Sequence, residues 1–273
     1  NEKVKNGPVI IESDNTTIVI GENGNYVKKI NGDIHVVITY PDINKEFVEY
    51  KNPINLELIL ARIRSIADEA DRIILKTAFS SAVRDGKDYS LVISDKNGRC
   101  VGMPTECMPL FITCMPRTIK IIANEFKDKL YDGDIIITND PWIASGHKSD
   151  VALISPVFIK KELFGFIGTI LHVADIGGSI GDFRAWDFFE EGLMISPVKF
   201  YNKNKLNLEL LKIIEKNVRL PKLVLGDIFA MVSTITAIKK NINSLNEKSS
   251  GLNFEKIADE YSKRMISAFR REL

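Results

Sequence analysis

The sequence predicts an α+β protein: a mixed β-sheet core with flanking helices, preceded by a small β-rich segment. Three observations support this fold class. Short β-branched runs fill the first 50 residues, strand-like apolar runs alternate with helical patterns up to residue 172, and the pattern is helical from residue 206 onward. The 273 residues are enough for one large domain or two smaller ones.

The composition is ordinary for a globular protein, with 45% hydrophobic and 27% charged residues. The net charge of +1 gives no electrostatic reason to expect nucleic acid or an anionic membrane as a partner. Apolar runs such as 163–171 are too short to span a bilayer. Three cysteines spaced seven apart, without a secretion signal, indicate reduced thiols and a cytoplasmic location.

The β-rich segment comes first. It contains the runs "PVIIES", "TTIVIG", "NYVKKI" and "IHVVITY", separated by Asn, Asp and Gly turns. Residues 40–53 are polar with prolines near both ends, which predicts a linker. We therefore expect two domains, residues 1–50 and residues 51–273.

The elements of the second domain are predicted from changes in the spacing at which hydrophobic residues recur along the sequence. A helix is expected over 55–78 with Asn55 as its N-cap, and a hairpin over 89–102. The remaining expected elements are a helix at 117–130, strands at 133–140, 150–159 and 162–172, and helices at 206–218, 223–245 and 254–273.

Two of the three histidines lie beside turns rich in Asp and Gly in the second domain, whereas His35 lies in the β-rich segment, in the run "NGDIHVVITY". If the turn between strands 150–159 and 162–172 centres near residue 161, residues whose numbers sum to about 322 lie opposite one another. Asp150 and His172 meet that condition, so they would share a face with Cβ atoms about 4.5–5.5 Å apart. A slip of one residue would put them on opposite faces.

His147, three residues before Asp150, can fold back over the same place. Two histidines and one carboxylate form the ligand set of a catalytic divalent metal, and these donors suit Zn, Mn or Fe equally. Asp88 is a candidate fourth ligand, and Asp140 and Asp175 are candidates to orient the imidazoles. The alternative reading is a helix cap or a simple ion pair.

Other motifs carry weaker signals. The run 175–182, "DIGGSIGD", can cradle a phosphate or form a flexible loop, and no nucleotide motif is present. Glu190 and Glu191 are either acids of the site or part of a solvated turn. Arg219 either binds a substrate carboxylate or lies on the surface or between subunits.

Four motifs together resemble hydantoinase B, the B component of the ATP-dependent hydantoinase/5-oxoprolinase family, which is related to one of the subunits of acetone and acetophenone carboxylases. They are "ITNDPWIASGHKSDVALISPVF", "HVADIGG", "FEEGLMISPVKFY" and "NVRLPKLVLGDIFA", within a match from about residue 53 to 245. The start, "NGPVIIESDNTTIVI", resembles the C-terminal end of the A component. Residues 1–50 would then be a β-rich A-type tail and residues 51–273 the N-terminal half of a B-like domain.

The resemblance implies that a hydantoinase A-like component, fused or separate, binds ATP and phosphorylates the amide or ketone oxygen. A hetero- or homo-oligomer is therefore expected. The B component carries a divalent metal, and the resemblance assigns its ligands to Asp88, His147, Asp150 and His172. Many members read "HIPVHLGSM" where this chain reads "ECMPLFITCMP", so Phe111 and Met108 would make the substrate pocket more apolar.

The expected function is part of an ATP-dependent hydrolase of cyclic amides of the hydantoin, oxoproline or lactam type, with the metal serving ring opening. Asp140 or Asp175 would accept a proton or orient a ligand, and Phe111, Glu191 and Arg219 would contact the small-molecule substrate. The alternatives are a component of an acetone- or acetophenone-type carboxylase, and a non-catalytic scaffold that docks a partner through helices 206–273.

Overall fold

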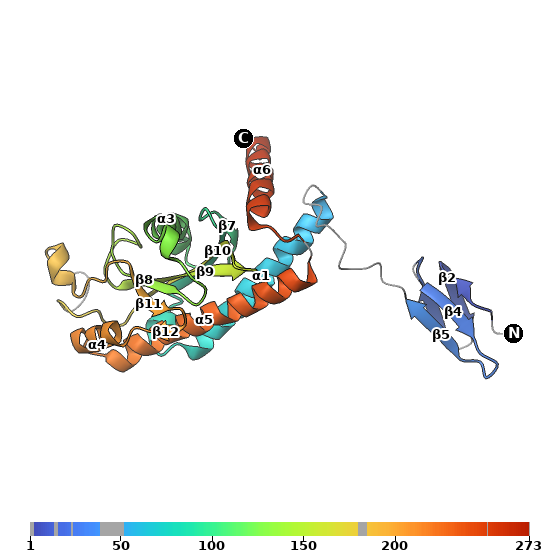
Figure 1. Ribbon diagram of the computed structural model, residues 1–273, viewed down its shortest axis with the longest axis horizontal. Helices are drawn as coiled ribbons and strands as arrows, with labels where there is room; N and C mark the ends of the chain where they lie inside the picture. The colour runs from blue at the N-terminus through green and yellow to red at the C-terminus, as the bar shows by residue number, and fades with distance from the viewer. Residues whose placement is uncertain are drawn as a thin grey trace. The chain divides into compact units, whose positions relative to one another are not determined.

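The computed structural model describes residues 3–13, 16–22, 24–38, 52–179, 185–249 and 251–272. Contacts divide the chain into two compact units, the first containing β1–β5 and the second containing α1–α6 (Figure 1). The predicted linker 40–53 lies outside the described residues except for Asn52 and Pro53. The assignment of residues 1–50 and 51–273 to two different components stays a prediction.

The first unit consists of short antiparallel strands, as its β-branched runs predict. Strands β1, β4 and β5 form one sheet, and β2 and β3 form a hairpin. Their bounds are β1 Lys5–Asn6, β2 Val9–Ser13, β3 Thr16–Ile20, β4 Gly24–Lys28 and β5 Ile34–Ile38. His35 lies in β5.

The second unit is built on a seven-stranded sheet with the order β12-β11-β8-β9-β10-β6-β7. The strands are β6 Tyr89–Asp95, β7 Cys100–Gly102, β8 Ile135–Thr138, β9 Asp150–Ile159, β10 Glu162–His172, β11 Val198–Asn202 and β12 Lys205–Leu206. The pairings described in this sheet are all antiparallel. Strands β9 and β10 have the predicted bounds, whereas the sequence reasoning did not predict β11 and β12.

Helices cover both faces of this sheet (Figure 1). They are α1 Pro53–Thr77, α2 Ser81–Arg84, α3 Pro109–Glu125, α4 Leu208–Asn217, α5 Pro221–Lys248 and α6 Phe254–Glu272, with short 3-10 turns at Lys127–Lys129 and Phe188–Glu191. The predicted α+β class, with a sheet core, flanking helices and a β-rich segment before them, is confirmed.

The strands divide their side chains between two apolar cores. Leu91, Leu153 and Ile167 pack with α1 and α5, whereas their neighbours Val92 and Ile154 pack with α3 on the other face. This alternation is the period-two pattern of a sheet that is buried on both sides. Residues of even number in β9, and in β10 after Gly165, therefore lie on the α3 face, whereas Leu163 and Phe164 before the bulge show the opposite alternation.

Two helix starts differ from the sequence prediction. Helix α1 begins at Pro53, and its N-cap is Asn52, not Asn55, because the Asn52 side chain accepts from the Ile54 N–H and proline suits the first helical position. Helix α3 begins at Pro109, before the predicted residue 117. Pro116 lies inside the helix, and Phe111 and Met115 extend its buried face toward the earlier start.

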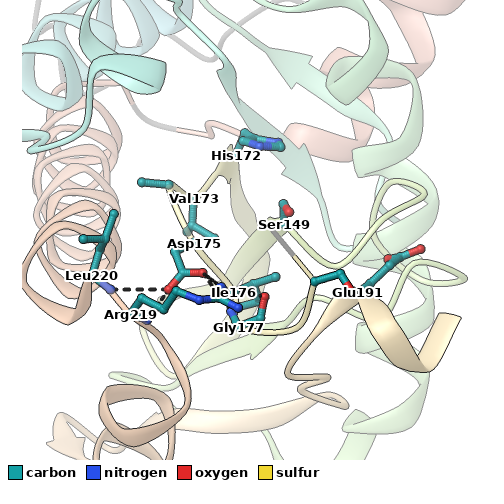
Figure 2. A pocket seen from close by; sticks show the side chains of 11 residues that line it. Ser149, His172, Val173, Asp175, Ile176, Gly177, Glu191, Arg219 and Leu220 are labelled. Atoms are coloured by element: carbon teal, nitrogen blue, oxygen red, sulfur yellow. Dashed lines mark hydrogen bonds and ion pairs between the residues drawn. The ribbon is translucent and has the colours of Figure 1, made fainter. Parts of the chain in front are cut away.

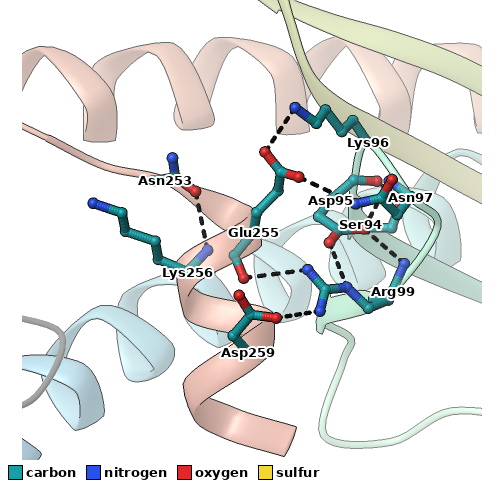
Figure 3. Close-up of polar contacts among 9 residues, drawn as sticks. All are labelled: Ser94, Asp95, Lys96, Asn97, Arg99, Asn253, Glu255, Lys256 and Asp259. Carbon is teal, nitrogen blue, oxygen red and sulfur yellow. Dashed lines mark hydrogen bonds and ion pairs between the residues drawn. The ribbon is translucent and has the colours of Figure 1, made fainter.

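The start of α6 is fastened to the turn between β6 and β7 (Figure 3). One oxygen of the buried Asp95 carboxylate accepts from the Asn97 and Arg99 N–H groups, and the other accepts from Arg99 Nε at 2.7 Å. The Arg99 guanidinium also bonds Asp259 and the Glu255 carbonyl of α6. A charged network therefore fixes the first turns of α6 to the sheet edge.

Helix α5 is long and apolar enough, by length and composition, to cross a membrane, and it is the only such helix in the described part of the chain. Its buried residues, from Val224 to Leu245, recur every three or four positions and join the core under the sheet. A core helix of a globular domain has this same pattern. Packing therefore accounts for its composition.

Candidate metal centre

Asp150 opens β9 and His172 closes β10, and the two residues pair directly across the hairpin. The predicted pairing is confirmed. His172 Nδ1 lies 3.1 Å from Asp150 Oδ1, and the Asp150 side chain is only 1% exposed. Both residues lie on the α3 face at one end of the sheet.

The third member of the cluster comes from the loop before β9. His147 Nε2 lies 3.4 Å from Asp150 Oδ2, and its ring stands edge-on to that of His172, with centroids 5.1 Å apart. Ser145 donates to the same Asp150 oxygen. One donor atom each from His147, Asp150 and His172 lies within 4.8 Å of the others.

Asp88 stands at the edge of this cluster. Its carbonyl accepts from the His172 N–H at 3.0 Å, and its carboxylate lies 3.9 Å from His172 Nδ1. Burial raises the pKa of Asp88, and the Asp150 carboxylate adds to the rise, whereas the two imidazoles oppose it. Asp88 therefore lies beside the cluster rather than among its three closest groups.

The three closest residues fit a divalent cation. Two imidazole nitrogens and a carboxylate are the donors that Zn, Mn and Fe accept in catalytic sites. The nitrogen of His147 that faces the Asp150 carboxylate is Nε2. The donor set supports a metal centre.

Asp140 stabilises the turn in which it lies. Its carboxylate accepts from the Trp142 N–H at 3.0 Å, and its carbonyl accepts from Ile143 and Ala144. Its described contacts thus shape the start of the loop that carries His147. They do not connect its carboxylate with either imidazole.

A cavity of about 300 Å³ adjoins His172 (Figure 2). Its wall includes Ser149, Asp175, Glu191 and Arg219, so three residues singled out from the sequence line one hollow next to the candidate metal ligands. Phe111 lies elsewhere. It is 2% exposed and belongs to the core under α3 because it continues the apolar stripe of that helix.

Arg219 and Asp175 bond each other within that wall. The Arg219 guanidinium donates to Asp175 at 2.8 Å and to the carbonyls of Gly177 and Gly178. Asp175 also accepts from the backbone N–H groups of Arg219, Leu220 and Gly177. These bonds hold the turn after His172 and occupy the Arg219 side chain, which was expected to bind a substrate carboxylate.

Burial alone would raise the pKa of Asp175. The hydrogen bonds from the Arg219 and Gly177 N–H groups and from the Arg219 guanidinium outweigh burial, so the pKa lies below its ordinary value of 3.8. A carboxylate with this environment is a poor proton acceptor at neutral pH. Its contacts indicate that it orients the turn that follows His172.

Asp175→Asn is expected to lower the free energy of unfolding at pH 7 by about 1–2 kcal/mol, because hydrogen bonds to a charged group are lost. Since folding lowers this pKa, the contribution is complete above the unfolded value of 3.8 and disappears as pH falls through the folded pKa. Denaturant unfolding of both proteins from pH 7 into the acid range measures it, with Asp128→Asn on an exposed turn as the control. A difference that does not change with pH would contradict this account.

The sequence reasoning missed Asn139 and Lys148, which join two parts of the site. Asn139 is fully buried, donates to the carbonyls of Lys148 and Leu193, and accepts from the Ile195 N–H. Lys148 is 2% exposed and donates to the Gly192 carbonyl. Their position inside the motifs "TNDP" and "GHKSD" was the available signal, but nothing in the sequence indicated burial of a lysine.

Comparison with known proteins places this site in a family. A model of the family Hydantoinase B/oxoprolinase matches residues 52–273, which hold the whole sheet and all the candidate ligands. The chain belongs to the hydantoinase B/oxoprolinase family. The family resemblance predicted from the motifs is thus confirmed.

One relative is the B component of a putative D-/L-hydantoinase from a Pseudomonas species, 32% identical over 189 residues, which cover 67% of this chain and 32% of that protein. The chain spans about a third or less of the length of the curated relatives that it matches. The activity, substrates and partners of a complete hydantoinase B protein are therefore matters for proposal here.

Two solved structures share the fold. A nucleotide-free acetone carboxylase superimposes with a TM-score of 0.70 at 23% identity, over 79% of this chain and 29% of that chain. The ATP-dependent caprolactamase of Pseudomonas jessenii superimposes with a TM-score of 0.69 at 22% identity, over 77% of this chain and 36% of that chain. At these identities the likeness establishes the architecture alone.

Proposed function

We propose that this chain supplies the metal centre of an ATP-dependent hydrolase of cyclic amides. The observation that carries the proposal is the convergence of His147, Asp150 and His172 beside a cavity. Membership of the hydantoinase B/oxoprolinase family supports the general class of reaction. The substrate would be a small ring of the hydantoin, oxoproline or lactam type.

His147, Asp150 and His172 would hold the cation, with Asp88 within reach as a further oxygen donor. A divalent cation supplies Lewis acidity toward a carbonyl oxygen and lowers the pKa of water. Ser145 fixes Asp150 by donating to its second carboxylate oxygen, and the Asp88 carbonyl fixes the backbone of His172. The ligands are thus set before any substrate enters.

Glu191 has the best position to contact substrate. It lines the cavity with His172, and its Oε2 atom accepts from the Lys148 N–H at 3.0 Å, which holds the carboxylate in place. A carboxylate so held accepts the ring N–H of an amide. Arg219 and Asp175 shape the opposite side of the hollow through their mutual ion pair.

ATP chemistry would belong to an A-like partner, fused or separate, that activates the carbonyl oxygen before the ring is opened. The relative that is named as one component of a hydantoinase supports such a partner. The proposal includes a small-molecule substrate, an oligomeric assembly and a cytoplasmic location. The three free thiols support that location.

The deciding experiment compares the metal content of wild type and His147→Ala after purification with Zn, Mn or Fe present. We expect about one divalent ion per chain in wild type and a loss of most of it in the variant, because one of three nitrogen and oxygen donors is removed. Equal metal content in both proteins would refute the metal centre. His35→Ala, in β5, is the control histidine.

An acetone-type carboxylase is the second candidate, because acetone carboxylase shares the fold. The two functions differ in the step that follows activation by ATP. In the hydrolase, water attacks the activated amide. In the carboxylase, a carbon nucleophile attacks activated carbon dioxide. ATP turnover by the complete assembly that is independent of bicarbonate but dependent on a cyclic amide supports the hydrolase. Turnover that requires bicarbonate and a ketone supports the carboxylase.

A further inference from the structure

Lys148 lies between two candidate ligands, His147 and Asp150, yet it is 2% exposed. Lysine is almost never fully buried without a partner. Its Nζ atom donates to the Gly192 carbonyl at 3.1 Å and lies 3.9 Å from the centre of the Phe188 ring. Both partners belong to the segment 187–193, which we call the cavity segment.

The backbone of Lys148 binds the same segment. Its N–H donates to Glu191 Oε2 at 3.0 Å, and its carbonyl accepts from Asn139 Nδ2 at 2.7 Å. Asn139 Nδ2 also donates to the Leu193 carbonyl at 2.9 Å. Lys148, in the loop that carries His147, is therefore attached to the cavity segment in three ways. Its ammonium and its N–H bind the segment directly, and its carbonyl is connected to the segment through Asn139.

The opposite side of the cavity segment rests on the turn after His172. The Ser179 N–H donates to the Glu190 carbonyl and the Leu193 N–H to the Ile176 carbonyl, both at 2.8 Å. The segment thus bridges the loop that carries His147 and the turn that carries Asp175. Glu191, in the middle of the bridge, is one of the residues that line the hollow beside His172 (Figure 2).

The ammonium has a specific part in this bridge. A buried charge is costly unless it is hydrogen-bonded, and an aromatic face stabilises a desolvated cation more strongly than an exposed one. The Gly192 carbonyl and the Phe188 ring supply this hydrogen bond and this aromatic face only while the cavity segment stays packed against Lys148. The cost of leaving the ammonium unpaired therefore favours the docked segment.

We propose that Lys148 is a positioning residue whose ammonium docks the cavity segment and thereby holds Glu191 in place for substrate. This inference rests on the proposed function for its link to substrate. It predicts that Lys148 governs substrate affinity, whereas metal retention depends on His147, Asp150 and His172. The motif residue between the ligands thus serves the cavity and not the cation.

The experiment compares Lys148→Met, which keeps an unbranched side chain one atom shorter and removes its charge, with Lys148→Arg and with Lys212→Met on the exposed side of α4. The first readout is hydrogen exchange of the amides of residues 187–193 in the chain without substrate. Lys148→Met is expected to speed their exchange at least about tenfold, because docking loses a cation–π contact and a charged hydrogen bond. Lys148→Arg is expected to restore part of the protection, and Lys212→Met to change nothing.

The second readout is kinetic, in the complete assembly with the A-like component. Lys148→Met is expected to raise KM for the cyclic amide at least about tenfold while kcat changes less than about threefold, since uniform binding is lost. Its metal content is expected to equal that of wild type. Unchanged exchange, or loss of metal together with protection, would overturn the positioning role. His147→Ala tests the metal function separately.

Discussion

Replacing Asp150 by asparagine is expected to lower the affinity for the divalent cation at least about 100-fold, because groups that merely support metal ligands already cost about 10–100-fold when removed. The Asp150 side chain lies between His147 Nε2 and His172 Nδ1 and is 1% exposed, so water cannot readily take its place. Asparagine keeps the shape and removes the charge. Cyclic-amide hydrolysis by the complete assembly is expected to fall by at least the same factor.

Two measurements make the Asp150 test decisive. Equilibrium dialysis against Zn, Mn or Fe gives the affinity, and thermal unfolding without metal shows whether the variant is still folded. Asp128→Asn, on an exposed turn, removes a carboxylate that has no place in the cluster and is expected to behave as wild type. Wild-type affinity in a folded Asp150→Asn protein would remove the basis of the proposed centre.

Gly178→Ala is expected to have the second large effect. Gly178 has φ of +63°, and a Cβ there would collide with the backbone of Glu190, Glu191 and Gly192. The free energy of unfolding is expected to fall by about 2–5 kcal/mol, from the left-handed backbone and from overpacking. The collision would also push the cavity segment away from the turn that carries Asp175. Denaturant unfolding gives the energy, and proteolysis between residues 187 and 193 reports the displacement.

Gly251→Ala is the matched control for this glycine. Gly251 has φ of +84°, and no atom of the described residues lies within 4 Å of its would-be Cβ. It is therefore expected to show only the cost of the left-handed backbone, about 1–2 kcal/mol. Equal losses in the two variants would mean that the contact between Gly178 and the cavity segment contributes nothing.

The pairing of Asp150 with His172 was predicted correctly, but the register near the hairpin turn differs from the one that the prediction assumed. The turn lies at Lys160–Lys161, both with positive φ, and next to it Glu162 pairs with Ile159. Continued without interruption, that register would set His172 opposite Ser149. An irregularity between Leu163 and Gly165 shifts the ladder by one residue.

The sequence could not show this bulge, because no side chain pattern distinguishes it. Gly165 beyond the bulge lies so close to the Ser94 carbonyl that a Cβ would collide with it. That close approach explains the glycine, but only the fold reveals the neighbour. The candidate metal ligands were accessible from the sequence because strand ends and histidines are visible in it.

The supporting groups were harder to predict. Lys148 and Asn139 act through contacts with residues about 45–55 positions away in the chain, and polar residues in a loop are usually solvated. For Arg219 the error was the reverse. Its charge suggested that it binds a substrate anion, whereas its guanidinium donates hydrogen bonds to Asp175 and to two backbone carbonyls. Distant pairings of this kind follow from topology, not from local pattern.

The hairpin of β9 and β10 places its Lys160–Lys161 turn about ten residues, or roughly 33 Å at about 3.3 Å per residue, from the end that carries Asp150 and His172. A fluorophore, an affinity tag or a surface tether attached at that turn would be remote from the chemistry. Because the bulge and the rest of the ladder fix the strand alignment, extra residues inserted between the two lysines would leave the distant end aligned. The hairpin turn is thus a convenient point for labelling or immobilising the protein with the candidate metal centre left free.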